Sequence, residues 1–324
     1  MAGLNLSADK FDEELRAVPL RERQFDNDEE VIVSICTITY NHAAYLRQCL
    51  EGFLDQVCSF RVEIIIYDDA STDGTSDIVR EYASRYPSVV NACVAESNSY
   101  SLGVNPYYAF AFPKAKGRYV AICDGDDFWN DLMKLAVQVD FLERNPDTVI
   151  TYGPACVEID GVIQKEMSLG SHRDLTASEL RAGASINTLT ACFRNPRLQT
   201  PPPFLRISPI GDVTVWALLG YRGSGKFLLN LEPAVYRIHG GGVFSGRPSN
   251  TKYYMSLLAH ISIAAYHSEH ADLQSERARL DRALSMIVGR MGAGRVLFNV
   301  LKELPNFAMK RLRVFVMRIA KSDW

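Results

Sequence analysis

The sequence feature that most constrains the fold is a short apolar segment that ends in three carboxylates. Residues 119–123 are mostly apolar and follow a turn glycine, which predicts a buried β-strand. Asp124, Asp126 and Asp127 come directly after it. Carboxylates this close together repel one another, and oxygen ligands suit Mg²⁺ or Mn²⁺. We therefore expect Asp124 and Asp126 to meet a divalent cation; the alternative is an acidic helix start, since Asp also caps helices.

Similar strands alternate with helical segments over the first half of the chain. Apolar runs predict the strands, and amphipathic or capped segments predict the helices between them. The expected strands cover residues 31–39, 61–67, 89–95, 118–123 and 148–152, and the expected helices cover 42–55, 76–86, 107–115 and 132–144. This alternation indicates an α/β fold with a mostly parallel, Rossmann-like sheet. Asp68 and Asp69 end the second strand, so two acidic clusters should meet at the sheet edge where such folds bind ligands.

Composition and missing motifs exclude several classes of protein. The chain carries 35 Lys and Arg against 38 Asp and Glu, so nothing suggests nucleic acid as a partner. No Gly-x-Gly-x-x-Gly follows the first strand, and Gly225-Lys226 is followed by Phe227, which argues against a classical dinucleotide domain and a P-loop NTPase. The seven cysteines lack metal-ligand spacing, and the first 30 residues do not resemble a secretory signal. We therefore expect a reducing, cytoplasmic location.

The second half of the chain has a different pattern. We expect a hairpin around Asp160-Gly161, and a short helix over residues 176–181 with a Thr-x-x-Glu capping box. Further strands are expected over residues 186–194, 227–231 and 234–238, a helix over 213–221, and helices from residue 251 to the end. These changes predict a polar leader over residues 1–30, an α/β domain over 31–246 whose halves meet at 153/154, and a C-terminal helical region over 247–324.

The end of the chain is basic and amphipathic. Residues 295–324 carry seven basic and two acidic side chains, with apolar residues between them. Basic amphipathic helices bind anionic membrane surfaces, so residues 290–321 predict peripheral contact with the inner face of the cell membrane. Packing on the rest of the chain or on a partner chain is an equally weighted alternative.

Five motifs, in this order and spacing, resemble the family 2 glycosyltransferases, and the last two resemble bacterial members that build surface polysaccharides. The motifs are Val33-Ser-Ile-Cys-Thr-Ile-Thr-Tyr-Asn41, Ile66-Tyr-Asp-Asp-Ala-Ser-Thr-Asp-Gly-Thr75, Cys123-Asp-Gly-Asp-Asp-Phe-Trp129, Gly211-Asp212 and Tyr236-Arg-Ile-His-Gly-Gly-Gly242. The resemblance implies a GT-A fold with a nucleotide-binding half over residues 31–153 and an acceptor half over 154–246. It also implies inverting transfer of a sugar from a nucleotide-diphosphate sugar, with a UDP-sugar favoured, to a glycan or lipid-linked acceptor.

The resemblance implies nucleotide-binding roles for five matched residues. Thr39 and Tyr40 would lie against the base, with the Tyr40 ring stacked on it. Asp69 would accept a hydrogen bond from the base, and Asp68 would support Asp69. Asp124 would contact the ribose or the metal. For Asp68 and Asp69 the alternative is a turn and a helix cap.

It further implies the residues of the reaction centre. Asp126 would bind Mg²⁺ or Mn²⁺, and His239 would reach the metal or the diphosphate from the opposite side. Asp212 would be the general base that deprotonates the acceptor hydroxyl; its alternative role is a helix cap. The family often has Glu before this Asp, whereas this chain has Gly211. Further candidates are Asp127, Trp129 and Arg237, the last of which suits either a phosphate or a carboxylate that it binds for folding.

Two other functions are compatible with parts of the pattern. A non-catalytic nucleotide-sugar or glycan-binding protein would keep the fold and need no general base. A phosphotransferase of the haloacid dehalogenase type also has Asp-x-Asp at a strand end. That type carries the motif on its first strand and follows it with Thr or Val, whereas here the fourth strand carries it and Asp127-Phe128 follows.

Overall fold

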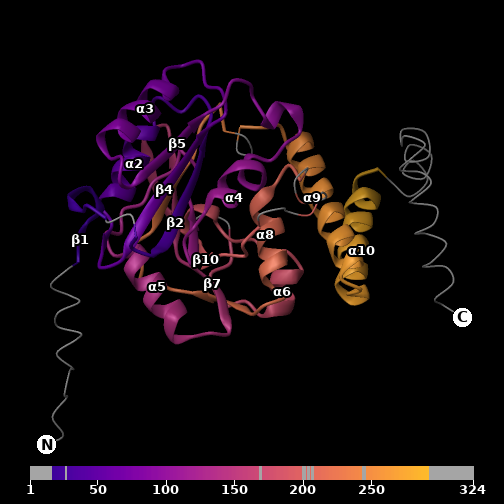
Figure 1. The fold of residues 1–324 in the computed structure, drawn as a ribbon. Helices are drawn as coiled ribbons and strands as arrows, with labels where there is room; N and C mark the ends of the chain where they lie inside the picture. Colours follow the sequence, from indigo (N-terminus) through magenta and orange to yellow (C-terminus); the bar gives the residue numbers. More distant parts are fainter. Residues whose placement is uncertain are drawn as a thin grey trace, which may run out of the picture.

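A seven-stranded sheet with helices on both faces forms the centre of the protein (Figure 1). The computed structural model describes residues 17–25, 28–167, 170–198, 202, 205, 208–242 and 246–291. The strand order is β11-β7-β10-β6-β2-β4-β5. The strands are β2 (Val31–Thr39), β4 (Arg61–Asp68), β5 (Val90–Val94), β6 (Tyr119–Ile122), β7 (Thr148–Tyr152), β10 (Cys192–Arg194) and β11 (Ser224–Phe227).

The sheet is mostly parallel, as the sequence predicts. Strand β2 pairs in parallel with β4 and β6, β4 with β5, and β11 with β7. Strand β10 lies antiparallel between β6 and β7. Because β2 runs parallel to both β4 and β6, the carboxyl ends of these three strands lie at one edge of the sheet.

Apolar side chains cover both faces of the sheet and pack against the helices. On one face the core includes Leu50 of α2 (Leu46–Leu54), Val79 of α3 (Thr75–Arg85) and Leu142 of α5 (Lys134–Arg144). On the other face it includes Tyr108, Phe112 and Trp216, which come from the short helical turns η3 (Tyr107–Ala111) and α4 (Phe112–Lys114) and from α8 (Gly211–Leu219). Side chains of a strand alternate between faces, so this burial on both sides explains the continuous apolar runs of the strands.

A smaller sheet of three strands, in the order β12-β8-β9, stands beside the central one. Strands β8 (Ala155–Ile159) and β9 (Val162–Met167) form the expected hairpin around Asp160 and Gly161, whose φ angles of 50° and 77° suit a tight turn. Strand β12 (Ala234–Ile238) pairs in parallel with β8 and forms a bridge from Val235 to Phe128. This bridge brings the end of β12 to the acidic segment after β6.

In the second half, two expected strands have the wrong bounds, whereas the expected capping box is confirmed. The capping box forms as predicted between Thr176 and Glu179 at the start of α6 (Ala177–Arg181). The strand expected over residues 186–194 is limited to β10, because Thr190 donates from its amide and its hydroxyl to the Asn187 carbonyl and forms the 3₁₀ turn η4 (Thr188–Thr190). The strand expected over 227–231 lies earlier, as β11, because the Ser224 amide donates to the Asp147 carbonyl beside β7.

Both ends of the described chain pack on this core. Leu20 and Phe25, which fall in the expected leader, are buried with the α2 side of the core, and β1 (Val18–Pro19) pairs with β3 (Val57–Cys58). The long helices α9 (Ser249–Glu269) and α10 (Leu273–Met291) pack against each other beside α8 (Figure 1). Residues 1–16 of the expected leader and the basic segment from residue 292 onward lie outside the described residues.

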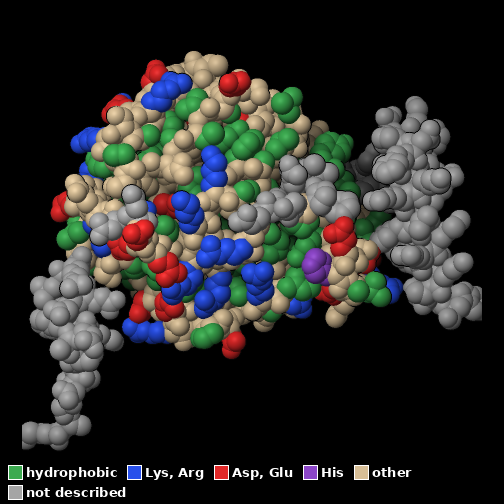
Figure 2. Space-filling model, in the orientation of Figure 1, with side chains coloured by type: hydrophobic (Ala, Val, Ile, Leu, Met, Phe, Trp, Pro, Cys, Tyr) green, Lys and Arg blue, Asp and Glu red, His purple; other side chains and the backbone are tan. Residues whose placement is uncertain are grey.

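The surface fits the near-balanced charge of the sequence. Figure 2 shows Lys and Arg side chains interspersed with Asp and Glu over one face of the molecule. None of the helices among the described residues combines the length and the apolar composition that crossing a membrane requires.

Candidate functional site

The carboxyl edge of the central sheet gathers polar side chains from several segments. Thr39 and Asp68 are the last residues of β2 and β4, and the acidic segment 124–127 follows β6. Backbone hydrogen bonds hold these ends together, since the Asp69 amide donates to the Thr39 carbonyl over 2.9 Å and the Gly125 amide to the Ile38 carbonyl over 3.0 Å. The site is therefore built on the rigid sheet rather than on free loops.

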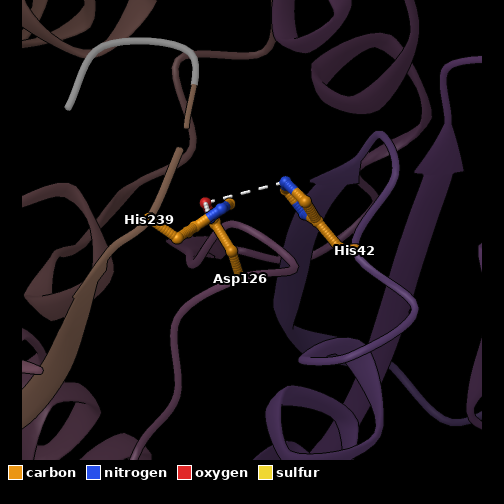
Figure 3. Close-up of side chains that lie close together, drawn as sticks. All are labelled: His42, Asp126 and His239. Atoms are coloured by element: carbon orange, nitrogen blue, oxygen red, sulfur yellow. Dashed lines mark hydrogen bonds and ion pairs between the residues drawn. The ribbon is translucent and has the colours of Figure 1, made fainter. Parts of the chain in front are cut away.

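Asp126 lies between two histidines from different parts of the chain (Figure 3). Its Oδ2 is 2.9 Å from Nε2 of His239 and 3.6 Å from Nε2 of His42. The three side chains are largely buried. Burial raises the pKa of the Asp126 carboxyl, but the hydrogen bond with His239 and the charges of both imidazoles outweigh it, so the pKa lies below its ordinary value. Asp126 is thus an anion that the two rings hold in place.

His42 is the residue of this cluster that the sequence reasoning missed. It lies in the turn between β2 and α2, and this turn delays the start of the expected helix 42–55 to Leu46. The His42 amide donates to Oγ1 of Thr75 over 2.8 Å, and the Ala43 amide donates to Asp73 over 3.0 Å. The loop after β4 therefore fixes the backbone of the turn. The position of His42 just after the first strand, at the same edge of the sheet as the acidic residues, was the signal that could have identified it.

Asp124 has a different environment from Asp126. The Tyr107 hydroxyl donates to Oδ1 of Asp124, and Asp124 is not part of the His–Asp–His cluster. Burial, followed by the neighbouring charge of Asp126, raises the pKa of Asp124 to about 7. A carboxylate with this pKa gains from any cation that approaches it, because the cation offsets the cost of its buried charge.

The three further candidates, Asp127, Arg237 and Trp129, make hydrogen bonds around the cluster of His42, Asp126 and His239. Oδ1 of Asp127 accepts a hydrogen bond from the Arg237 amide over 2.9 Å. The buried Arg237 guanidinium donates to Glu158 over 3.0 Å, to the Asp126 carbonyl over 2.9 Å and to Gln48. Trp129 is buried, and its Nε1 donates to the Leu189 carbonyl over 2.6 Å. Of the two interpretations of Arg237, this geometry matches pairing with a carboxylate for folding.

The four residues expected near the base lie at the ends of β2 and β4. Both oxygens of Asp69 accept backbone hydrogen bonds, from the Ser99 amide over 2.6 Å and from the Tyr100 amide over 3.0 Å. Asp68 accepts from two serine hydroxyls in the loop that follows it. Thr39 is buried, whereas Tyr40 is 38% exposed. Each carboxylate oxygen of Asp69 has a second lone pair, so it can accept one more hydrogen bond.

Asp212 lies in the first turn of α8. Its Oδ2 accepts from the Thr188 hydroxyl over 2.5 Å, and its Oδ1 accepts from the Val213 amide over 2.7 Å. Burial raises the pKa of Asp212, and these two hydrogen bonds oppose that effect only in part. The Tyr108 hydroxyl is hydrogen-bonded to Thr214 of α8, and the neighbouring Tyr107 donates to Asp124, so residues 107 and 108 join the start of α8 to Asp124.

The surroundings of Gly211 explain why this chain lacks the Glu that the family often has before the Asp. A Cβ at this position would lie 2.6 Å from Nδ2 of Asn105. That amide donates to the Ser208 carbonyl over 3.2 Å and so joins the loop before η3 to the loop before α8. The space that a Glu would take is therefore occupied by Asn105, and Asp212 faces the site without a carboxylate next to it in the chain.

The cluster of His42, Asp126 and His239 fits a divalent metal ion. One ligand atom from each residue lies within 4.8 Å of the others. Ligands at about 2.1 Å from an octahedral metal are about 3 Å apart, close to the distances of 2.9 and 3.6 Å from Asp126. Imidazole suits first-row transition metals better than Mg²⁺, which prefers oxygen ligands. The donor set therefore favours Mn²⁺ among the two expected cations.

Comparison with known proteins gives a consistent result. The family model described as Glycosyl transferase family 2 matches residues 34–194. Uncharacterized protein Rv1520 of Mycobacterium tuberculosis is 31% identical over 306 residues, which cover 90% of this chain and 85% of that protein. The Escherichia coli UDP-Glc:alpha-D-GlcNAc-diphosphoundecaprenol beta-1,3-glucosyltransferase WfaP is 28% identical over 239 residues, which cover 73% of this chain and 89% of that protein.

A solved structure is similar in fold. The structure of S. aureus TarS 1–349 in complex with UDP-GlcNAc matches with a TM-score of 0.55, at 17% identity, over 80% of this chain and 73% of that chain. An identity this low supports similarity of fold alone. The GT-A fold that the sequence predicts, a mostly parallel sheet between helices, is confirmed.

Proposed function

The chain belongs to glycosyl transferase family 2, and from this premise we propose that it is an inverting, metal-dependent glycosyltransferase. In this proposal it moves a sugar from a nucleotide-diphosphate sugar to an acceptor hydroxyl during the synthesis of a bacterial surface polysaccharide or glycolipid. The observation that carries the proposal is the placement of Asp126 and its two histidines at the sheet edge, with Asp212 at the start of α8, which residues 107 and 108 join to Asp124. A binding protein would have no need of the general base Asp212.

The donor is expected to be a UDP-sugar bound along the nucleotide-binding half, residues 31–153. The name of WfaP specifies UDP-Glc as donor, and the TarS complex holds UDP-GlcNAc, which supports this choice. The exposed Tyr40 ring would stack on the base, and Asp69 would accept a hydrogen bond from it. Asp124, Asp126 and His239 would hold Mn²⁺ or Mg²⁺. A divalent metal bound there supplies Lewis-acid stabilisation of the leaving diphosphate.

Asp212 would take the proton of the acceptor hydroxyl. Its burial raises its pKa, which makes it a stronger base than an exposed Asp. The Thr188 hydroxyl and the Val213 amide fix both oxygens, so the carboxylate keeps one orientation. The hydroxyl then attacks the anomeric carbon on the face opposite the diphosphate, and this single displacement inverts the configuration.

The acceptor half, residues 154–246, would bind a glycan or a lipid-linked sugar. The name of WfaP specifies a sugar on diphosphoundecaprenol, which supports a lipid-linked acceptor here. Such an acceptor would place the reaction at the cytoplasmic face of the membrane, where the basic segment 290–321 would make peripheral contact. That segment lies almost entirely outside the described residues, so membrane contact stays a prediction.

The experiment that tests the proposal is a transfer assay with defined products. The purified chain is incubated with Mn²⁺, a panel of UDP- and GDP-sugars and a polyprenyl-diphosphate-linked sugar, and nucleoside diphosphate release is measured. We expect release that depends on the acceptor, and NMR of the product should show the inverted anomer. A retained anomer would contradict the single displacement. Tight nucleotide-sugar binding with no release from any pair would favour the glycan-binding alternative.

A further inference from the structure

Asp126 is faced by two imidazoles, and only one of them has a role in the function proposed above. Nε2 of His42 points at the same carboxylate oxygen as Nε2 of His239 (Figure 3). The two rings lie 5.8 Å apart, with an angle of 84° between their planes. Each ring therefore directs one nitrogen toward the space beside Oδ2 of Asp126.

The His42 side chain is not explained as part of the fold. Its backbone amide, not its ring, ties the turn to Thr75. The ring is 6% exposed, yet its Nδ1 has no hydrogen-bond partner in the described part of the chain. Nε2 lies 3.6 Å from Oδ2 of Asp126, which is too far for a hydrogen bond, so an ion between these two atoms would give the buried ring the polar partner that buried groups normally have.

The neighbouring residues leave room for this ring. Gly125 stands against it, and a Cβ at Gly125 would lie 3.2 Å from Nδ1 of His42 and 2.8 Å from Oγ1 of Thr39. On the opposite side, the Tyr45 ring packs against His239 at 4.6 Å between centroids, and the Gly241 amide donates to Nδ1 of His239. While Nδ1 accepts this hydrogen bond, the proton of a neutral His239 is on Nε2, so metal binding through Nε2 moves that proton to Nδ1 and breaks the contact with the Gly241 amide.

We propose that His42, Asp126 and His239 together bind one divalent transition-metal ion, with Nε2 of His42 as the third protein ligand. Three ligands from three separate segments form a site without help from the nucleotide, and they leave further positions of an octahedral ion open to water or phosphate. Two imidazoles among three ligands favour Mn²⁺ over Mg²⁺. This inference rests on the proposed function only in assigning the same ion to the donor diphosphate; the binding itself does not depend on transfer.

The first test measures Mn²⁺ binding to the full-length protein without nucleotide. The EPR signal of free Mn²⁺ monitors the binding. We expect one site whose occupancy survives a tenfold excess of Mg²⁺. His42→Gln should weaken Mn²⁺ binding by roughly 10- to 100-fold, since loss of even an outer partner of a metal ligand has an effect of this size. His270→Gln, on the α9–α10 pair, is the matched control and should bind like the unmodified protein. Equal Mn²⁺ affinity in His42→Gln and His270→Gln would overturn the proposal.

A second measurement needs no variant. Pulsed EPR of the Mn²⁺ complex, compared between protein labelled with ¹⁵N-histidine and unlabelled protein, counts the imidazole nitrogens on the metal. Two nitrogens support the proposal, whereas one nitrogen, or no Mn²⁺ binding before UDP is added, overturns it. This result tests the metal ligands independently of the proposed function. Sugar transfer can succeed with one histidine on the metal, and two histidines can bind Mn²⁺ in a protein that transfers no sugar.

Discussion

Two acidic clusters stand at the same edge of the sheet, and they differ in how their charges are satisfied. In the first cluster, after β4, Asp69 accepts two backbone amides and Asp68 accepts two serine hydroxyls. In the second, after β6, Asp124 has one tyrosine hydroxyl, and burial raises its pKa to about 7. The protein alone thus supplies two hydrogen-bond donors to each carboxylate of the first cluster, whereas in the second Asp124 has one and Asp126 depends on the two imidazoles.

The difference suggests that the two acidic clusters have different functions although their sequences are similar. A carboxylate whose oxygens accept hydrogen bonds stabilises the loop that donates them. A group of buried carboxylates without enough donors opposes folding until a cation arrives. We therefore expect the first cluster to shape the nucleotide site and the second to bind the ion. Asp212 resembles Asp124 in that burial raises its pKa, and its two hydrogen bonds oppose that effect only in part.

The largest expected effect is on catalysis, at Asp212. Asp212→Asn keeps the shape of the side chain and removes the base, so kcat should fall by about 10²- to 10⁴-fold. The melting temperature should stay close to that of the unmodified protein, since a neutral amide avoids the cost of a buried charge. A steady-state transfer assay measures kcat, and differential scanning fluorimetry checks folding. A variant with nearly unchanged kcat would remove Asp212 from the mechanism.

The next effect contrasts the two clusters directly. Mn²⁺ at about 100 times its Kd should stabilise the protein by about 2.7 kcal/mol, because it binds the folded chain only. Asp126→Asn should abolish this gain, whereas Asp69→Asn should keep it. Urea unfolding with and without Mn²⁺ measures the gain in each variant. An equal gain in both variants would show that the ion binds elsewhere, and the comparison between the clusters would fail.

A smaller effect is expected for the first cluster without any metal. Asp69→Ala leaves the amides of Ser99 and Tyr100 without their acceptor, which should cost about 1–3 kcal/mol of unfolding free energy. Urea unfolding in the presence of EDTA measures this loss. The control is Asp77→Ala, whose side chain is 85% exposed and which should change stability by about 0.5 kcal/mol or less. If both substitutions have the same effect, Asp69 does not hold the loop.

Much of the fold could be predicted because its signals are local. The bounds of β2 and β12 agree with the apolar runs that predict them, and the hairpin turn and the capping box each depend on residues within a few positions. The parallel pairing of β2, β4, β5 and β6 also follows from chain-level rules, because alternating strands and helices favour a parallel sheet. The acidic segments after β4 and β6 could be placed at one edge for the same reason.

What could not be predicted depends on contacts between distant segments. The strand expected over residues 186–194 is shorter because Thr190 turns back to Asn187, and an apolar pattern does not show that competition. His42 faces Asp126 only because β12 and the loop after β4 fix both sides of the site. The alternative roles of Arg237 could be separated only once Glu158 and Gln48 were seen beside its guanidinium.

The smallest expected effect is a shift in pH dependence, and it tests whether Asp212 shares the poor charge compensation of the second cluster. A general base acts when deprotonated, so kcat falls as the pH drops through its pKa. Burial raises the pKa of Asp212, which moves this loss to a higher pH than for an exposed Asp. The Thr188 hydroxyl donates to the charged form, so Thr188→Val should raise the pKa further and move the acidic limb of kcat toward neutral pH, with little change at pH 8. Thr188→Ser restores the hydroxyl and should restore the limb. With Mn²⁺ saturating throughout, limbs that coincide in all three proteins would mean that another group sets the pH dependence.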